Sequence, residues 1–144
     1  MVCKLRLSEV LPLRAAVLRN GHIAPEACIN PGDEAPDTFH TGWKDAAGSV
    51  WGIATFMAEN HPWQTGIGYR LRGMAVAPDW QGKGLGKAIL QAGIEILQQQ
   101  QINYLWCNAR KVAYPFYENC GFIYLSAEFE IAGIGPHKVM LRKL

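Results

Sequence analysis

The sequence predicts a mixed α/β fold in which most strands come early, one strand–helix–strand crossover lies in the middle, and the end of the chain is antiparallel. Three observations support this prediction. Short extended segments fill the first half, an apolar stripe at helical spacing runs from Leu85 to Gln100, and another apolar run follows at Ile102–Cys107. A strand after a crossover helix pairs in parallel with the strand before it. We therefore expect one parallel pair within an otherwise antiparallel arrangement.

A strand and a helix are predicted at the N-terminus. Val2–Leu7 alternates apolar and polar side chains, which is typical of a half-exposed strand. Ser8 is a typical helix cap, and the apolar residues behind it recur at helical spacing until Asn20–Gly21 ends the pattern. Pro12 is expected so early in this helix that its missing N–H costs little.

Residues 21–37 are expected to form a long loop with at most a short helix, because three prolines interrupt them and no period is sustained. Two interpretations stay open. The loop is either a wall of a substrate cleft or a solvated acidic connector, and its acids are Glu26, Asp33, Glu34 and Asp37.

Three further strands precede the central helix. Thr38–Trp43 and Ser49–Met57 are joined by a polar turn that ends in glycine, which predicts a β-hairpin. After an irregular stretch at residues 59–68, Tyr69–Ala77 resumes the extended pattern. An antiparallel meander of three strands is therefore expected.

The C-terminal third contains a second amphipathic helix and the last strands. Ala109–Asn119 has apolar residues at helical spacing, and Pro115 predicts an irregular start near Ala113. Phe122–Phe129 and Lys138–Leu144 are predicted as strands, joined by a connecting segment at residues 130–137.

Length and composition predict one folded domain, residues 1–144, that needs no disulfide and no metal. The net charge of +2 and the lack of a Lys/Arg-rich run argue against nucleic-acid binding. No stretch approaches the roughly 18 apolar residues of a membrane span, so a cytoplasmic protein without a membrane partner is expected. The cysteines show neither zinc-site nor redox spacing and are predicted to be free thiols: Cys3, Cys28, Cys107 and Cys120.

The strongest functional signal is Gln81–Lys87, which places three alternating glycines between an extended segment and the central helix. Glycines let the backbone approach an anion, and a helix start offers unpaired N–H groups and the positive end of the helix dipole. Lys83 and Lys87 add positive charge. The segment therefore predicts a phosphate-binding loop.

Two common phosphate-binding loops are excluded by spacing. A Walker A loop requires glycine at the position of Gln81 and a hydroxyl side chain at the position of Ala88. A dinucleotide-binding fingerprint requires GxGxxG in an early βαβ unit, whereas these glycines lie two residues apart in the middle of the chain.

The wider pattern resembles the GNAT superfamily of acyl-CoA-dependent N-acetyltransferases. The resemblance covers the strand and loop of Val76–Gly86, the crossover helix, and the Ala-x-x-Phe-Tyr-x-x-x-Gly-Phe pattern of Ala113–Phe122, which Asn108 precedes. Glu130 and Gly135–His137 further resemble a bacterial subgroup with mostly unassigned substrates. The resemblance implies a mixed, mostly antiparallel sheet of about six to seven strands, with the central parallel βαβ pair splayed open and helices on both faces.

The resemblance also implies that acetyl-CoA is the co-substrate. Main-chain N–H groups of the glycine loop would hold the pyrophosphate, and the preceding strand would pair with the pantetheine arm. Asn108 would contact pantetheine through its amide, and Arg110 or Lys111 would approach the nucleotide end. The implied coenzyme-binding residues are Met74, Ala75, Val76, Gln81, Gly82, Lys83, Gly84, Leu85, Gly86, Lys87, Asn108 and Tyr117.

Acetyl transfer from a thioester to an amine needs a donor to the developing oxyanion and a proton for the leaving thiolate. A main-chain N–H near Val76 is the predicted oxyanion donor. The resemblance places Tyr117 at the family position of the general acid. A phenol with a pKa of about 10 is protonated at neutral pH and can donate to a thiolate. The alternative is that Phe116 and Tyr117 only pack under the pantetheine.

The substrate ammonium must also lose a proton before attack. His137 is the predicted base or substrate ligand, because histidine titrates near neutral pH. Its alternative role is that of a hydrogen-bonded turn residue beside Pro136. His61 is a further candidate, and the weaker ones are Glu59, Glu128 and Glu130.

The predicted reaction is acetyl transfer from acetyl-CoA to a primary amine, most simply a small molecule, within a ternary complex. The acidic loop would favour a cationic acceptor such as a polyamine, an aminosugar or a lysine side chain. Two alternatives stay open: a non-catalytic sensor of acyl-CoA, and an acetyltransferase for a protein lysine or N-terminus. Homodimer formation is compatible with the sequence, which determines neither the oligomeric state nor the acceptor.

Overall fold

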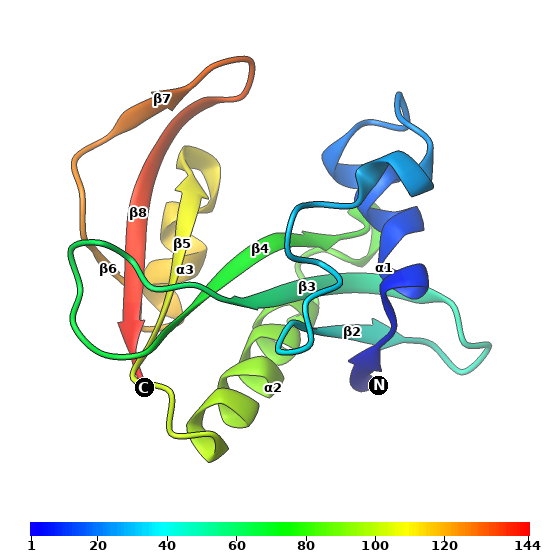
Figure 1. Cartoon of the computed structure of the whole chain (residues 1–144). Coiled ribbons are helices and arrows are strands. Elements are labelled where there is room, and N and C mark those ends of the chain that lie inside the picture. Colours follow the sequence, from blue (N-terminus) through cyan, green and yellow to red (C-terminus); the bar gives the residue numbers. More distant parts are fainter.

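A computed structural model describes residues 1–144 as a single eight-stranded sheet with helices packed on both faces (Figure 1). The strand order is β1-β2-β3-β4-β5-β8-β6, and β7 pairs with β8 beside β6. In chain order the elements are β1 (Val2–Leu5), α1 (Leu7–Leu13), the π-helical turn η1 (Arg14–Leu18), the 3₁₀ turn η2 (Pro25–Cys28), β2 (Phe39–Lys44), β3 (Val50–Ala58), β4 (Gly68–Val76), the 3₁₀ turn η3 (Pro78–Trp80), α2 (Leu85–Gln99), β5 (Tyr104–Arg110), the 3₁₀ turn η4 (Lys111–Ala113), α3 (Tyr114–Asn119), β6 (Ile123–Tyr124), β7 (Phe129–Ile131) and β8 (Gly135–Lys143).

The sheet is antiparallel except at β4 and β5, the two strands joined by the crossover helix α2. The parallel pairing is short, since only Gly68–Arg70 pairs with Tyr104–Trp106. Beyond these residues the strands diverge, as Figure 1 shows for the green β4 and the yellow β5. The predicted mixed sheet with a splayed parallel pair and helices on both faces is confirmed.

The two faces of the sheet carry separate apolar clusters. On one face, Ile89 and Ile94 of α2 pack with Phe56 and Leu71, and all four side chains are buried. On the other face, Val10 of α1 packs with neighbouring strand residues in a smaller cluster. The amphipathic stripe of the central helix therefore covers its face as predicted.

The number of strands exceeds the expected six to seven, because the predicted strand Phe122–Phe129 is divided into β6 and β7. Between them, the Ser126 hydroxyl accepts the Val139 N–H at 2.8 Å and replaces a main-chain acceptor of the ladder. β8 begins already at Gly135, so the predicted connection at residues 130–137 is instead a tight turn between β7 and β8.

The first helix starts and continues differently from the prediction. Arg6, not Ser8, precedes the first helical residue, and its N–H donates to the Glu9 carboxylate at 2.8 Å. Pro12 lies inside α1 rather than in its first turn, and the helix widens into η1 directly afterwards. A proline removes an N–H and crowds the preceding turn, which accounts for an irregular continuation.

The helix predicted at Ala109–Asn119 is shorter, because β5 continues through Arg110 and α3 begins only at Tyr114, after the turn η4. The remaining elements lie where the sequence predicted them, within a few residues. The hairpin β2–β3, the strand β4, the helix α2 and the irregular start of α3 are all present. All four cysteines are free, as predicted. None of the helices combines the length and the apolar character that a membrane crossing requires.

Candidate active site

The divergence of β4 and β5 opens a cavity of about 1120 Å³. Its walls are residues 70–76 of β4, residues 107–110 of β5, the segment that leads into α2, and the inner side of α3. Val17 and Leu18 of η1 close it from the other face of the sheet. The cavity therefore exists because these two parallel strands stop pairing after three residues each.

The end of β4 presents an unpaired main-chain donor to this cavity. The N–H of Ala77 donates to the Trp51 carbonyl of β3 at 2.8 Å. Successive residues of an antiparallel strand direct their N–H and C=O groups to opposite sides. The N–H of the preceding residue, Val76, therefore faces away from β3, toward the open edge of the sheet.

The carbonyl of Val76 is already engaged, because it accepts a hydrogen bond from the Gln81 side-chain amide at 3.0 Å. Gln81 also donates its main-chain N–H to the carbonyl of Pro78 at 3.3 Å. Gln81 thus braces the end of β4, and its N–H is not free for a ligand. This differs from the expectation that the row of binding amides begins at Gln81.

The six following N–H groups, those of residues 82–87, donate to no acceptor of the protein. Gly82 and Gly84 have left-handed backbone conformations, with φ of +74° and +82°, and a Cβ at either position would meet nothing within 4 Å. The loop thus combines free donors, a helix start and open space, which suits an anion such as a pyrophosphate.

The two lysines of the loop differ in position. Lys87 lines the cavity, whereas Lys83 lies outside its lining and over the Trp80 ring, with Nζ 5.0 Å from the ring centroid. Of the other predicted coenzyme residues, Met74, Leu85 and Asn108 line the cavity. Ala75 also lines it, although the side chain is buried against α1.

Tyr117 projects from α3 into the wall of the cavity. It is 8% exposed and packs against the rings of Phe116 and Phe122, each with its centroid 5.2 Å away. Burial, and then the nearby Cys107 and Cys120, raises the pKa of Tyr117 well above 10. The phenol is therefore protonated at neutral pH and able to donate a proton.

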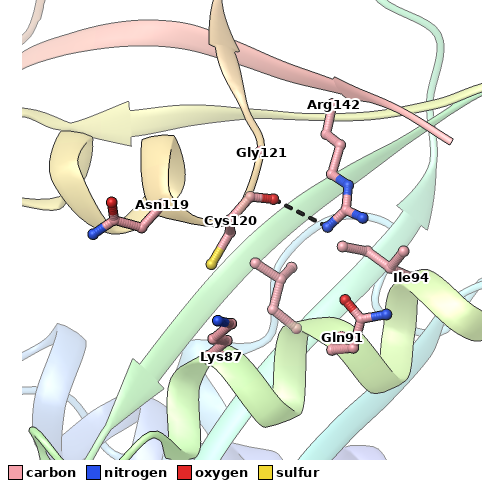
Figure 2. Close-up of a pocket in the computed structure, with 8 residues that line it drawn as sticks. Lys87, Gln91, Ile94, Asn119, Cys120, Gly121 and Arg142 are labelled. Atoms are coloured by element: carbon pink, nitrogen blue, oxygen red, sulfur yellow. Dashed lines mark hydrogen bonds between the residues drawn. The ribbon is translucent and has the colours of Figure 1, made fainter.

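A smaller hollow of about 290 Å³ lies between α2 and the end of α3 (Figure 2). It shares Lys87, Asn119 and Cys120 with the main cavity. Its far side is formed by Arg142, which donates from Nη1 to the Cys120 carbonyl at 3.0 Å. The hollow thus has two cationic side chains in its wall, Lys87 and Arg142, and sequence reasoning had assigned no role to Arg142.

The structure does not bring His137 together with Tyr117 at the cavity. His137 is 3% exposed, donates from Nδ1 to the Gly135 carbonyl at 2.8 Å and stacks on Phe129. Its main chain pairs with Arg110 on β5. The other candidate bases also lie outside the cavity lining: Glu59, His61, Glu128 and Glu130.

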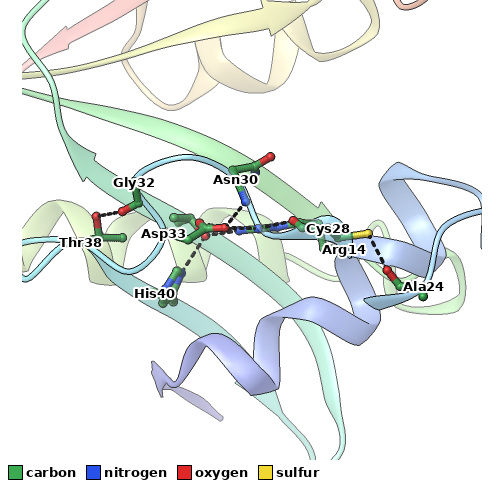
Figure 3. Close-up of polar contacts among 9 residues, drawn as sticks. Arg14, Ala24, Cys28, Asn30, Gly32, Asp33, Thr38 and His40 are labelled. Atoms are coloured by element: carbon green, nitrogen blue, oxygen red, sulfur yellow. Dashed lines mark hydrogen bonds and ion pairs between the residues drawn. The ribbon is translucent and has the colours of Figure 1, made fainter. Parts of the chain in front are cut away.

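The acidic loop does not supply carboxylates to the cavity. Asp33 turns inward, where both of its oxygens accept from the Arg14 guanidinium, at 2.6 and 3.2 Å (Figure 3). Arg14 also donates to the Cys28 carbonyl and to Thr55. The other acids of the loop are exposed and outside the cavity lining: Glu26, Glu34 and Asp37.

Two charged residues of the cavity received no role from sequence reasoning. Arg70 and Arg72 line the cavity from β4, in the strand directly before the glycine loop. Their spacing of two residues is the available signal, because alternate strand residues share one face of a sheet. The spacing does not reveal which face of the sheet the two arginines share, because that depends on how β4 packs in the fold.

Known proteins share these features. The family model for the acetyltransferase (GNAT) domain matches residues 37–141. The chain is 31% identical over 140 residues to YitI, an uncharacterized N-acetyltransferase of Bacillus subtilis (strain 168), which covers 96% of this chain and 92% of that protein.

Solved structures with low sequence identity have the same fold. Escherichia coli ElaA aligns with a TM-score of 0.78 and 20% identity, over 99% of this chain and 98% of that chain. An aminoglycoside 6'-N-acetyltransferase complexed with coenzyme A aligns with a TM-score of 0.78 and 10% identity, over 99% and 96%. The splayed β4–β5 pair, the glycine loop and the family match lead to one conclusion: the chain belongs to the GNAT family and is an N-acetyltransferase.

Proposed function

We propose that the protein transfers an acetyl group from acetyl-CoA to a primary amine of a small molecule, by direct attack within a ternary complex. The observation that carries this proposal is the convergence of three features on one cavity: the outward N–H of Val76, the free N–H groups of residues 82–87, and the protonated phenol of Tyr117. Each feature meets one need of thioester aminolysis.

The coenzyme half of the site fits acetyl-CoA. The free amides and open space of the glycine loop suit the pyrophosphate, and Lys87 adds positive charge beside it. The unpaired edge of β4 suits the pantetheine amides, with Asn108 facing that edge from β5. The fold is shared with an aminoglycoside acetyltransferase that was crystallised with coenzyme A, which supports this assignment.

The proposed chemistry divides between two groups of the protein. Acetyl-CoA supplies an acetyl group activated as a thioester. The Val76 N–H donates to the carbonyl oxygen, where negative charge develops as the amine attacks. Tyr117 donates its proton to the sulfur as the carbon–sulfur bond breaks, and the phenolate regains a proton that the nitrogen of the tetrahedral intermediate gives up, directly or through water. No Asp, Glu or His side chain lines the cavity, so we infer that the amine passes its proton to water.

The experiment that tests this proposal measures thiol release from acetyl-CoA over a panel of primary amines, beside coenzyme A binding by titration calorimetry. Thiol release that depends on a small amine supports the proposal. Binding without release from any amine or peptide would identify an acyl-CoA sensor, and release with peptides alone would identify a protein acetyltransferase. Gly84→Asp, which places a side chain and a negative charge in the loop, serves as the binding-deficient variant.

A further inference from the structure

The cavity is strongly asymmetric in charge. Four of its lining residues are cationic, and none is acidic: Arg70, Arg72, Lys87 and Arg110. Lys87 belongs to the glycine loop, and Arg110 lies at the exposed end of β5. Arg70 and Arg72 remain to be explained, because they lie on β4 upstream of the residues assigned to the coenzyme.

The two arginines lie on the face of the sheet opposite the glycine loop. Leu71, between them, is buried in the cluster under α2, the helix that the glycine loop starts. Neighbouring residues of a strand point to opposite faces, so Arg70 and Arg72 point to the face that carries α1 and η1. Val17 and Leu18 of η1 line the cavity on that side. This is the half of the cavity left for the acceptor.

Protein carboxylates only partly balance these cations. Glu59 lies 3.6 Å from Nη1 of Arg70 and is its single ion-pair partner. Arg72 forms no ion pair and no side-chain hydrogen bond. The buried acid Asp33 is engaged by Arg14. Of the two guanidinium groups, only that of Arg70 is paired with a carboxylate, and that carboxylate is partly exposed.

The side chain of Arg70 is held in place, but not all of its N–H donors have an acceptor. Its guanidinium carbon lies 5.0 Å from the Trp106 ring centroid, and its side chain is 20% exposed. Its Nε is buried without a hydrogen-bond partner. Burial, and then the neighbouring Arg70, lowers the pKa of Arg72. An anion bound between these side chains would relieve their repulsion and satisfy free donors.

We propose that the acceptor is an amine that also carries an anionic group, a carboxylate or a phosphate monoester, which Arg70 and Arg72 bind. This inference rests on the proposed acetyltransferase function and names its substrate class. Guanidinium groups bind both anions through paired N–H donors. The assignment replaces the cationic acceptor expected from the acidic loop, whose carboxylates lie outside the cavity.

The same arginines favour the reactive form of the acceptor. A cationic neighbour disfavours an ammonium group relative to the neutral amine. An acceptor anchored by its anion next to two guanidinium groups therefore gives up its proton to water more readily. This effect fits a cavity that contains no acidic side chain or histidine.

The test compares kcat/KM, with saturating acetyl-CoA, for amines that differ only in their anion. The pairs are β-alanine and β-alaninamide, glycine and glycinamide, and glucosamine 6-phosphate and glucosamine. We expect at least one acidic member to exceed its neutral partner by about tenfold or more, and the pair that does so distinguishes a carboxylate from a phosphate. Arg72→Gln should remove this preference, and Arg72→Lys should restore part of it.

The matched control is Lys143→Gln, which removes one positive charge at an exposed position outside the cavity. It should leave the preference unchanged. The proposal is overturned if neutral members of all pairs react as well as acidic ones, or if Arg72→Gln lowers kcat/KM equally for both members.

A binding measurement decides the matter if no amine of the panel reacts. Calorimetric titration of the acidic amines into the coenzyme A-saturated protein should show binding that Arg72→Gln abolishes, and no binding to the wild type overturns the proposal. Failure of the underlying acetyltransferase function gives a different result: the wild type would then release no thiol from acetyl-CoA with any amine or peptide.

Discussion

The guanidinium of Arg14 and the carboxylate of Asp33 form an ion pair of 2.6 Å between side chains that are 2% and 0% exposed. The pair ties the acidic loop to the sheet, because Arg14 also donates to Thr55 on β3 at 3.0 Å. The Nε of Arg14 lies 3.3 Å from the position that a Cβ would take at Gly73, in the bulged part of β4. The ion pair therefore packs against the part of β4 that forms a wall of the cavity.

Removing the charge of Asp33 should destabilise the fold. Asp33→Asn keeps the size of the side chain but leaves a buried guanidinium without its counter-charge, so we expect the free energy of unfolding to fall by about 3–5 kcal/mol. Urea denaturation measures this change. Asp37→Asn, at an exposed position of the same loop, should change it by less than about 0.5 kcal/mol. Equal effects of the two substitutions would contradict a structural role of the pair.

Gly84→Asp should weaken coenzyme A binding by about tenfold or more, because a carboxylate would stand beside the phosphates and a residue other than glycine is strained at this φ. Titration calorimetry measures the effect. Gly48→Asp is the matched control: Gly48 has a φ of +85°, its Cβ position is equally open, and it lies in the β2–β3 turn. Normal coenzyme A binding by Gly84→Asp would show that the glycine loop is not the pyrophosphate-binding site.

Tyr117→Phe should lower kcat by about 100-fold or more while the Kd for coenzyme A stays nearly constant, since only the phenolic proton is lost. Steady-state kinetics and calorimetry separate the two effects. Tyr124→Phe removes a hydroxyl that bonds to Glu118 at an exposed site and should leave kcat unchanged. If Tyr117→Phe turned over at the wild-type rate, Tyr117 would be a packing residue only.

Cys107 should make stability decline with alkaline pH. Burial raises the pKa of its thiol from 9.0 to about 12 in the folded protein. The folded state therefore retains the proton more strongly than the unfolded state, and this contribution is complete below pH 9 and lost as pH rises toward 12.

Between pH 9 and pH 10 the free energy of unfolding of the wild type should thus fall by up to about 1 kcal/mol more than that of Cys107→Ala. Urea denaturation at both values tests this difference. Cys3→Ala, a half-buried control, should follow the wild type. Parallel curves for the wild type and Cys107→Ala would refute the assignment.

Local chemistry determined much of this protein from the sequence alone. The apolar stripe of α2, its crossover position and the glycines before it depend only on residues near one another in the chain. The parallel pair and the glycine loop at the start of α2 were therefore predictable. Tyr117 was located by the spacing of a family motif, and it lines the cavity in the structure.

Contacts between distant residues decided the rest. Asp33 is withdrawn from the cavity because Arg14, 19 positions earlier, reaches it in the interior. His137 is held by a hydrogen bond to the Gly135 carbonyl at the start of β8, away from the cavity lining. Arg70 and Arg72 line the cavity on the α1 side of the sheet only because Leu71 packs under α2 and β4 parts from β5. Sequence spacing cannot reveal which face of a strand is buried or where two strands separate, because both depend on packing between elements.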